Sequence, residues 1–226
     1  MKPEKEYAIT ACKELETILS RYGFKTLSKG LLFKRKLNTD ITQEIRFQIT
    51  SNLDIIVHIA VMTEMVKQWN KANYNVEIDT VLTNQLGYLT PIQNWKTWII
   101  GKSDIAKKQF QKEVLFQIEE YIMPLFDKFN DINALIEELI ENNGSWNKYE
   151  KKIQILPIET VLCYKNLDEG QKLLNNFLKE NRTYLKLIKQ HKLDEMKEFN
   201  FKHSEFFGAN KFKIAFDKGL SLNYTS

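Results

Sequence analysis

Residues 45–61 read IRFQITSNLDIIVHIAV, and this stretch decides the fold class. Apolar and polar residues alternate over residues 45–49, and apolar residues recur at every second position over residues 55–61. Alternation with a period of two is typical of a β-strand whose two faces meet different surroundings. Ser51 and Asn52 form a short, turn-forming connection between the two segments, which predicts an antiparallel hairpin.

A third segment with the same period precedes this hairpin. Residues 31–37 alternate, and the turn-forming residues 38–40 connect them to the hairpin, so we expect three antiparallel strands in chain order. The consecutive charges of residues 34–36 are typical of a sheet edge that is protected against further pairing. Residues 55–61 are apolar on both faces, which predicts a central strand with a helix over its second face. We also predict two or three further strands in residues 74–100.

Helical periodicity flanks the predicted sheet on both sides. Residues 3–22 carry apolar residues at three- and four-residue steps, and Gly23 follows as a stop signal. A longer helix is expected from Ser103 or Asp104 onward, with Pro124 producing a kink or ending its first part.

These segments together predict an α+β fold. It consists of an N-terminal helix, an antiparallel sheet of about four to six strands packed on helices, and a helical C-terminal region. We expect residues 1–145 to form the sheet domain and residues 146–226 to form the helical region, which packs on the first.

The composition is that of a folded protein rather than of a disordered chain. Of 226 residues, 43% are hydrophobic and 27% are charged, which provides enough apolar side chains for a core. No apolar run approaches the roughly 20 residues needed to cross a bilayer, and the charged beginning of the chain is unlike a signal peptide. Cys12 and Cys163 both lie in apolar-periodic segments, so we expect buried free thiols. The expected location is the cytoplasm, without membrane contact.

The charge is distributed unevenly along the chain. Residues 1–150 contain 19 Lys and Arg against 20 Asp and Glu, a net charge of −1, whereas residues 151–226 contain 14 against 9, a net charge of +5. A basic region can attract phosphate groups. The cations there are spread singly along the sequence rather than in a run, which is more typical of a solvated helical surface. Nucleic-acid binding through the C-terminal helices therefore stays open as an alternative.

Motifs of known catalytic or metal-binding chemistry are missing from the sequence. It contains no glycine-rich phosphate loop and no nucleophile elbow. His58, His191 and His203 are far apart, and the two cysteines add no ligand cluster, so we predict neither a metal site nor a cofactor. A nuclease would need converging carboxylates around Mg²⁺. The available carboxylates have no lysine beside them in a recognisable arrangement and are interpreted as polar residues at strand edges: Asp54, Glu77 and Asp79.

His58 is the most informative single residue. It lies in the middle of the third predicted strand, on the face opposite Val57 and Ile59, and across from Arg46 or Gln48 in a hairpin of simple register. It belongs either to a polar cluster on an open sheet face or to a half-buried environment under a helix, where it would be hydrogen-bonded. The candidate binding surface comprises polar residues of the predicted strands and one tryptophan: Lys34, Lys36, Arg46, Gln48, His58 and Trp98.

Two tryptophans lie near the end of the predicted sheet. Trp95 and Trp98 are three residues apart, so they point to opposite faces if their segment is extended. We therefore expect one of the two rings to be exposed and available as a stacking or interface residue.

The order of several short motifs resembles a known bacterial family. The helix end Tyr22-Gly23-Phe24-Lys25 is followed by Leu32-Phe33-Lys34-Arg35 and then by Ile45-Arg46-Phe47-Gln48. With the helical motif of residues 122–126, this order looks like the bacterial domain-of-unknown-function family 4304 over about residues 5–143. Thr26 stands where the family pattern has a second lysine, and Lys34 stands where it has an aromatic residue.

The resemblance implies an α+β fold and assigns no catalytic residues. Related small bacterial α+β domains act as partners or immunity proteins of toxins, which implies a binding role by association. We therefore expect a non-catalytic protein-binding module of the immunity-protein kind, whose partner is another protein. The alternative is a nucleic-acid-binding protein or a nuclease-like enzyme of unfamiliar type, with Arg46, His58 and Lys34 or Lys36 around a groove.

Overall fold

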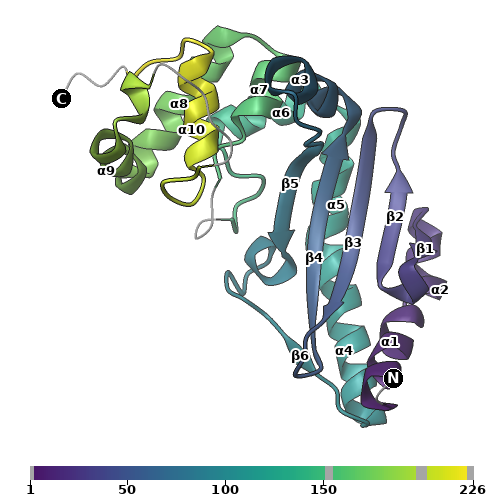
Figure 1. The fold of residues 1–226 in the computed structure, drawn as a ribbon. Coiled ribbons are helices and arrows are strands. Elements are labelled where there is room, and N and C mark those ends of the chain that lie inside the picture. The colour runs from purple at the N-terminus through teal and green to yellow at the C-terminus, as the bar shows by residue number, and fades with distance from the viewer. Residues whose placement is uncertain (1–2, 151–154, 197–202, 223–226) are drawn as a thin grey trace.

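The computed structural model describes residues 3–150, 155–196 and 203–222. Its fold is α+β, as predicted: an N-terminal helix, an antiparallel sheet and a helical C-terminal region follow one another along the chain (Figure 1). None of the helices in these residues has the length and apolar character that a bilayer-spanning segment requires.

The sheet is antiparallel throughout. Within the described residues it contains β1 (Lys25–Leu27), β2 (Leu32–Lys36), β3 (Ile41–Ile49), β4 (Asp54–Thr63), β5 (Thr80–Gln85) and β6 (Trp98–Ile99). The strand order is β1-β2-β3-β4-β5, and β6 pairs with β4 beyond the end of β5. Both predicted hairpins are confirmed, because β2 pairs with β3 and β3 pairs with β4. β4 is central, as its apolar residues on both faces predicted.

The predicted edge strand does not lie at the edge of the sheet. β1 pairs with β2 and places Lys25 opposite Lys34, so the prediction that residues 34–36 form the edge is wrong. β1 is three residues long, which is too short for an alternating pattern to be visible in a sequence. It pairs only with the first part of β2, and the register leaves Arg35 and Lys36 beyond it.

Helices that precede the sheet in the sequence and helices that follow it pack together on one of its faces. α1 (Pro3–Lys13) and α2 (Glu16–Leu19) precede the sheet, and α4 (Asp104–Gln117) and α5 (Met123–Asp127) follow it. Phe47 of β3 meets Phe110 of α4 edge-on, with ring centroids 6.3 Å apart, and Gln43 donates a hydrogen bond to the carbonyl oxygen of Phe126 in α5. Burial of these apolar side chains is the main driving force for closing this layer.

The long helix is interrupted close to Pro124. A π-helical turn (Ile118–Ile122) joins α4 to α5, so the predicted change of geometry takes the form of a widened turn just ahead of the proline. Apolar residues remain on the side that faces the sheet: Val114, Ile118, Ile122, Leu125 and Phe126 are all buried.

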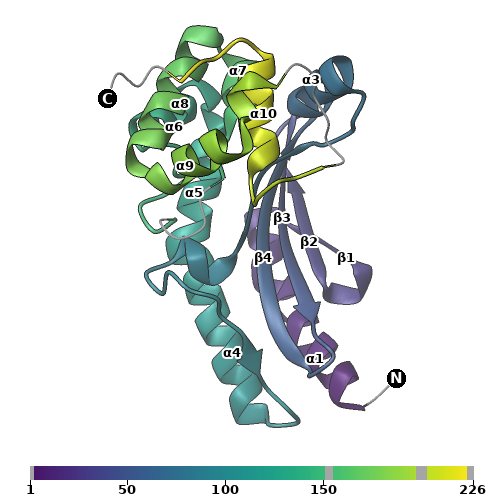
Figure 2. The same cartoon turned by 60° about the vertical axis from the view of Figure 1, so that its left-hand side comes forward.

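The second face of the sheet has no helix over β2 to β4 within the described residues (Figures 1 and 2). Arg46 and Gln48 are exposed there, and His58 is half-buried. The prediction of a helix over the second face of β4 is therefore wrong. Ile56 is buried on this face, and Trp95 of the segment that leads into β6 stands edge-on to His58, two residues further along β4.

The remaining helices gather at the end of the sheet where β4 finishes. They are α3 (Glu64–Tyr74), α6 (Ile132–Glu141), α7 (Ile158–Tyr164), α8 (Leu167–Glu180), α9 (Arg182–His191) and α10 (Ala209–Asp217). α7 packs on α3, and α8 packs on α6. The buried apolar side chains form one cluster that runs from α1 to α10, across the boundary expected near residue 145. Cys12 is buried and Cys163 half-buried, and both thiols are free.

Candidate functional site

The open face of the sheet brings together five of the six predicted site residues. The register places Arg46 opposite His58, with Gln48 two residues along the same strand. Lys34 lies opposite Glu44, and Lys36 lies opposite Thr42, on the same face. Directly opposed residues of antiparallel strands share a face, so the side chains form one continuous surface. We call these five residues and Glu44 the open-face cluster: Lys34, Lys36, Glu44, Arg46, Gln48 and His58.

Glu44 is a member of this cluster that sequence reasoning missed. It is only 5% exposed, and its two oxygens lie 3.0 Å from Nζ of Lys34 and 3.1 Å from a guanidinium nitrogen of Arg46. Both cations remain substantially exposed, so solvent screens the two ion pairs and each contributes at most about 1 kcal/mol. Their effect is mainly to orient the Lys34 and Arg46 side chains across the sheet.

The surroundings of His58 disfavour its charged form and give its ring a hydrogen-bond partner. Partial burial lowers its pKa below the ordinary value, and the nearby Arg46 cation lowers that pKa further. Nε2 of His58 lies 2.9 Å from Oε1 of Gln48, so the neutral tautomer with its proton on Nε2 donates to the amide oxygen. This hydrogen bond and the edge-on ring of Trp95 orient the imidazole on the open face.

The exposed tryptophan is Trp95, and the choice of Trp98 as a surface residue is wrong. Trp98 is 6% exposed, lies opposite Ile55 on the helix-covered face, and meets Phe110 edge-on at 5.8 Å between ring centroids. Trp95 is 51% exposed, and its ring stands edge-on to His58 at 6.3 Å. The sequence indicates that the two rings point apart, but not which one faces solvent.

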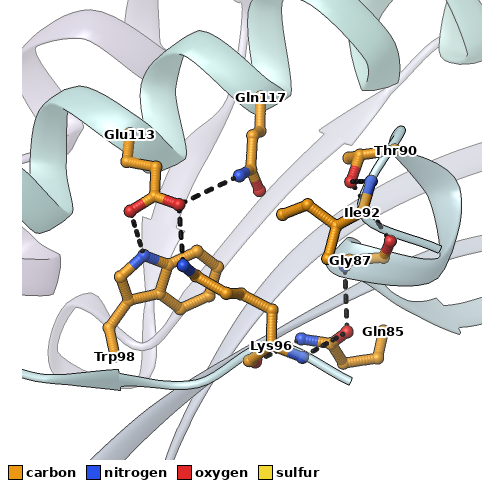
Figure 3. A network of polar contacts seen from close by, with 8 residues as sticks. All are labelled: Gln85, Gly87, Thr90, Ile92, Lys96, Trp98, Glu113 and Gln117. Carbon is orange, nitrogen blue, oxygen red and sulfur yellow. Dashed lines mark hydrogen bonds and ion pairs between the residues drawn. The ribbon is translucent and has the colours of Figure 1, made fainter. Parts of the chain in front are cut away.

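The segment that carries Trp95 is fastened to the end of β5. Figure 3 shows the Gln85 side chain between two parts of this segment. Its Oε1 accepts hydrogen bonds from the backbone N–H groups of Gly87 and Lys96, at 2.9 and 3.3 Å, and its Nε2 donates to the carbonyl oxygen of Lys96. Thr90 adds a hydrogen bond to the carbonyl oxygen of Gly87. A single buried amide thus ties the start of residues 86–97 to their end.

The same segment is fastened to α4 through Glu113. One carboxylate oxygen of Glu113 accepts the indole N–H of Trp98 at 3.0 Å, and the other lies 2.9 Å from the ammonium group of Lys96 (Figure 3). Gln117 donates a longer hydrogen bond to Glu113. Because both ends of residues 86–97 are held by side chains, the ring of Trp95 is presented on a prearranged support.

The carboxylates considered for nuclease chemistry do not converge. Asp54 begins β4 and lies opposite Ile99, whereas Glu77 and Asp79 precede β5 near the other end of β4. Glu77 is exposed and paired with Lys71. Within the described residues, no group of histidine, cysteine and carboxylate side chains could hold a metal ion.

Comparison with protein-family models, with curated proteins and with solved structures gives no match to this chain. The resemblance to family 4304 therefore stays a prediction, and the function has to be argued from the geometry of the chain itself.

Proposed function

We propose that this protein is a non-catalytic protein-binding module whose partner docks on the open face of the sheet, with Trp95 as its anchor. The observation that carries the proposal is the half-exposed ring of Trp95, which stands against His58 beside the exposed Arg46. Tryptophan and arginine are the residue types that contribute most binding energy at protein interfaces.

The support under Trp95 favours tight binding. A partner that covers this ring does not have to order a loose loop first, because residues 86–97 are already fixed by Gln85 and Glu113. Association then loses less conformational entropy, and more of the contact free energy remains as affinity.

The charge of the open face favours an acidic partner. Lys25, Lys34, Lys36 and Arg46 lie on this face, and Glu44 compensates only part of their charge. Complementary charge accelerates association and makes the association rate sensitive to salt. We therefore propose a partner surface with carboxylates around an apolar recess that accepts the indole.

The immunity-protein role and the cytoplasmic location are proposed from the sequence alone. The resemblance to family 4304 supports the immunity-protein form of a binding module, and the expected location is the cytoplasm. Neither statement changes the experiment, because a toxin bound by an immunity protein would be captured like any other protein partner.

The test combines capture with one substitution. The tagged protein is used to capture partners from host lysate after nuclease treatment, and the affinity of the recovered protein is then measured for the wild type and for Trp95→Ala. We expect the substitution to weaken binding about 30-fold, equivalent to about 2 kcal/mol for an anchor residue.

The matched control is Phe116→Ala, because Phe116 is 57% exposed on α4, away from the open face. It should leave the affinity unchanged, and circular dichroism of both variants shows that the fold persists. A partner whose affinity does not depend on Trp95 would contradict the proposal, as would a capture that recovers no protein after nuclease treatment.

A further inference from the structure

Helix α9 presents a row of three cations to solvent. Arg182, Lys186 and Lys189 are spaced by four and three residues, which places them within about 60° of one another around the helix axis. All three are exposed. At 1.5 Å of rise per residue the row is about 10 Å long. Figure 1 shows α9 at the outer side of the helical region, away from the strands.

These cations have no acidic partner among the described residues. The side chains of all three lack an ion pair or hydrogen bond with the described residues, in contrast to Lys34 and Arg46, which share Glu44. The exposed carboxylates nearest to the row in the described sequence lie beyond its ends: Glu180 precedes α9, and Asp194 and Glu195 follow it. Within residues 3–150, 155–196 and 203–222, no carboxylate therefore pairs with the positive charge of this row.

The opposite side of α9 holds the helix in place. Ile188 is completely buried, and Tyr184 packs between the rings of Phe177 and Phe212, at 5.7 and 5.3 Å between centroids. Leu185 also packs on the core. The backbone that carries the three cations is thus fixed, while their side chains keep their freedom to reach a ligand.

We propose that α9 binds the phosphate backbone of a nucleic acid without reading its base sequence. One strand of a duplex carries a negative charge about every 3.4 Å along its axis, so a row of about 10 Å faces about three phosphates. Three cations therefore equal these phosphates in number. Contacts of this kind position a protein on nucleic acid and carry no sequence information.

The composition of the exposed face favours nucleic acid over the other polyanions. The exposed residues of α9 are all polar: Arg182, Thr183, Lys186, Lys189, Gln190 and His191. A helix that inserts into an anionic membrane needs apolar side chains at its surface, and a protein interface needs an aromatic or aliphatic anchor. The face offers neither, whereas phosphate binding requires only charge.

The experiment measures binding of the full chain to a fluorescently labelled 20-base-pair DNA duplex of mixed sequence, by anisotropy over a range of salt concentrations. Three phosphate contacts predict a slope of about −2.7 in log affinity against log salt concentration. The affinity should therefore fall about 40-fold between 50 and 200 mM salt. Changing the duplex sequence should leave the affinity unchanged.

Two triple variants with the same change in net charge locate the site. Substitution of all three row residues by glutamine (R182Q, K186Q and K189Q) should weaken binding at 50 mM salt at least tenfold and flatten the salt slope. The control replaces exposed lysines outside α9 (K5Q, K108Q and K112Q) and should retain both affinity and slope. Trp95→Ala should also retain them, which separates this site from the one in the proposed function.

Three results would overturn the proposal. One is the absence of salt-dependent binding to the duplex, and another is an equal loss of affinity in the two triple variants. The third is binding to phosphatidylserine vesicles through α9 without binding to the duplex.

Discussion

Substitution of Glu150 by glutamine should change how the stability of this fold depends on pH. Glu150 is 6% exposed and accepts hydrogen bonds from the backbone N–H of Trp146 and from the side-chain amide of Asn84, both at 2.9 Å. Burial raises the pKa of its carboxyl group from 4.5 to about 7, and the two hydrogen bonds offset only part of that increase.

The sign follows from proton linkage. The folded state binds the Glu150 proton more tightly than the unfolded state does, so this group favours folding most at low pH. Its contribution is complete below about pH 4.5 and is lost as the pH rises toward about 7. A difference of about 2.5 pKa units corresponds to about 3 kcal/mol of unfolding free energy, as an order of magnitude.

Urea unfolding of the wild type and of Glu150→Gln at several pH values measures this contribution. Glutamine cannot ionise, so the unfolding free energy of the variant minus that of the wild type should grow by about 2–3 kcal/mol between pH 5 and pH 8. Glutamine keeps only one of the two acceptor oxygens and loses one accepted hydrogen bond, but that loss is a constant offset and does not alter the growth with pH. Glu141→Gln, at an exposed site, is the control. Parallel profiles for wild type and Glu150→Gln would refute the reasoning.

Three further substitutions test the packing and the loop. Phe177→Ala removes a fully buried ring that contacts Phe212 and should lower the unfolding free energy by about 3–5 kcal/mol in urea denaturation; a loss below about 1 kcal/mol would contradict the packing. Gly87→Ala places a methyl group against the carbonyl oxygen of Asn94 and should cost about 1–3 kcal/mol in the same assay, whereas an unchanged midpoint would mean that the loop is looser than described. Asp131→Ala removes the cap of α6 and should lower stability by about 1 kcal/mol in thermal denaturation, and no change would exclude a capping role.

The parts of the fold that the sequence predicts correctly are the long periodic segments. The alternation over residues 45–61 is sufficient to define β3, β4 and their hairpin, because a one-residue shift would expose every buried side chain. Short elements could not be predicted in this way. β1 and β6 have three and two residues, and Gly87, within residues 74–100 where further strands are expected, lies in a 3₁₀ turn. Their conformation depends on what they pack against.

In the candidate site, too, the periodic pattern predicts some features and not others. Arg46 and His58 are neighbours because the register follows from the alternating pattern. The exposure of Trp95 rather than Trp98 depends on where the two-residue strand β6 begins, and no periodicity indicates that position. The cation row of α9 was hidden for a different reason: its members are separated in the sequence, and they align only when the segment is wound into a helix.

The shared edge of β4 has a consequence for divergence among related chains. β5 and β6 pair with different parts of this one edge, so residues 86–97 leave it and return to it at two points that β4 itself defines. A loop whose two ends are fixed in this way can change in length and sequence without shifting the register of any strand, since loops on a fixed scaffold tolerate such change. The partner recognition that we propose for this loop can therefore change while the sheet stays the same.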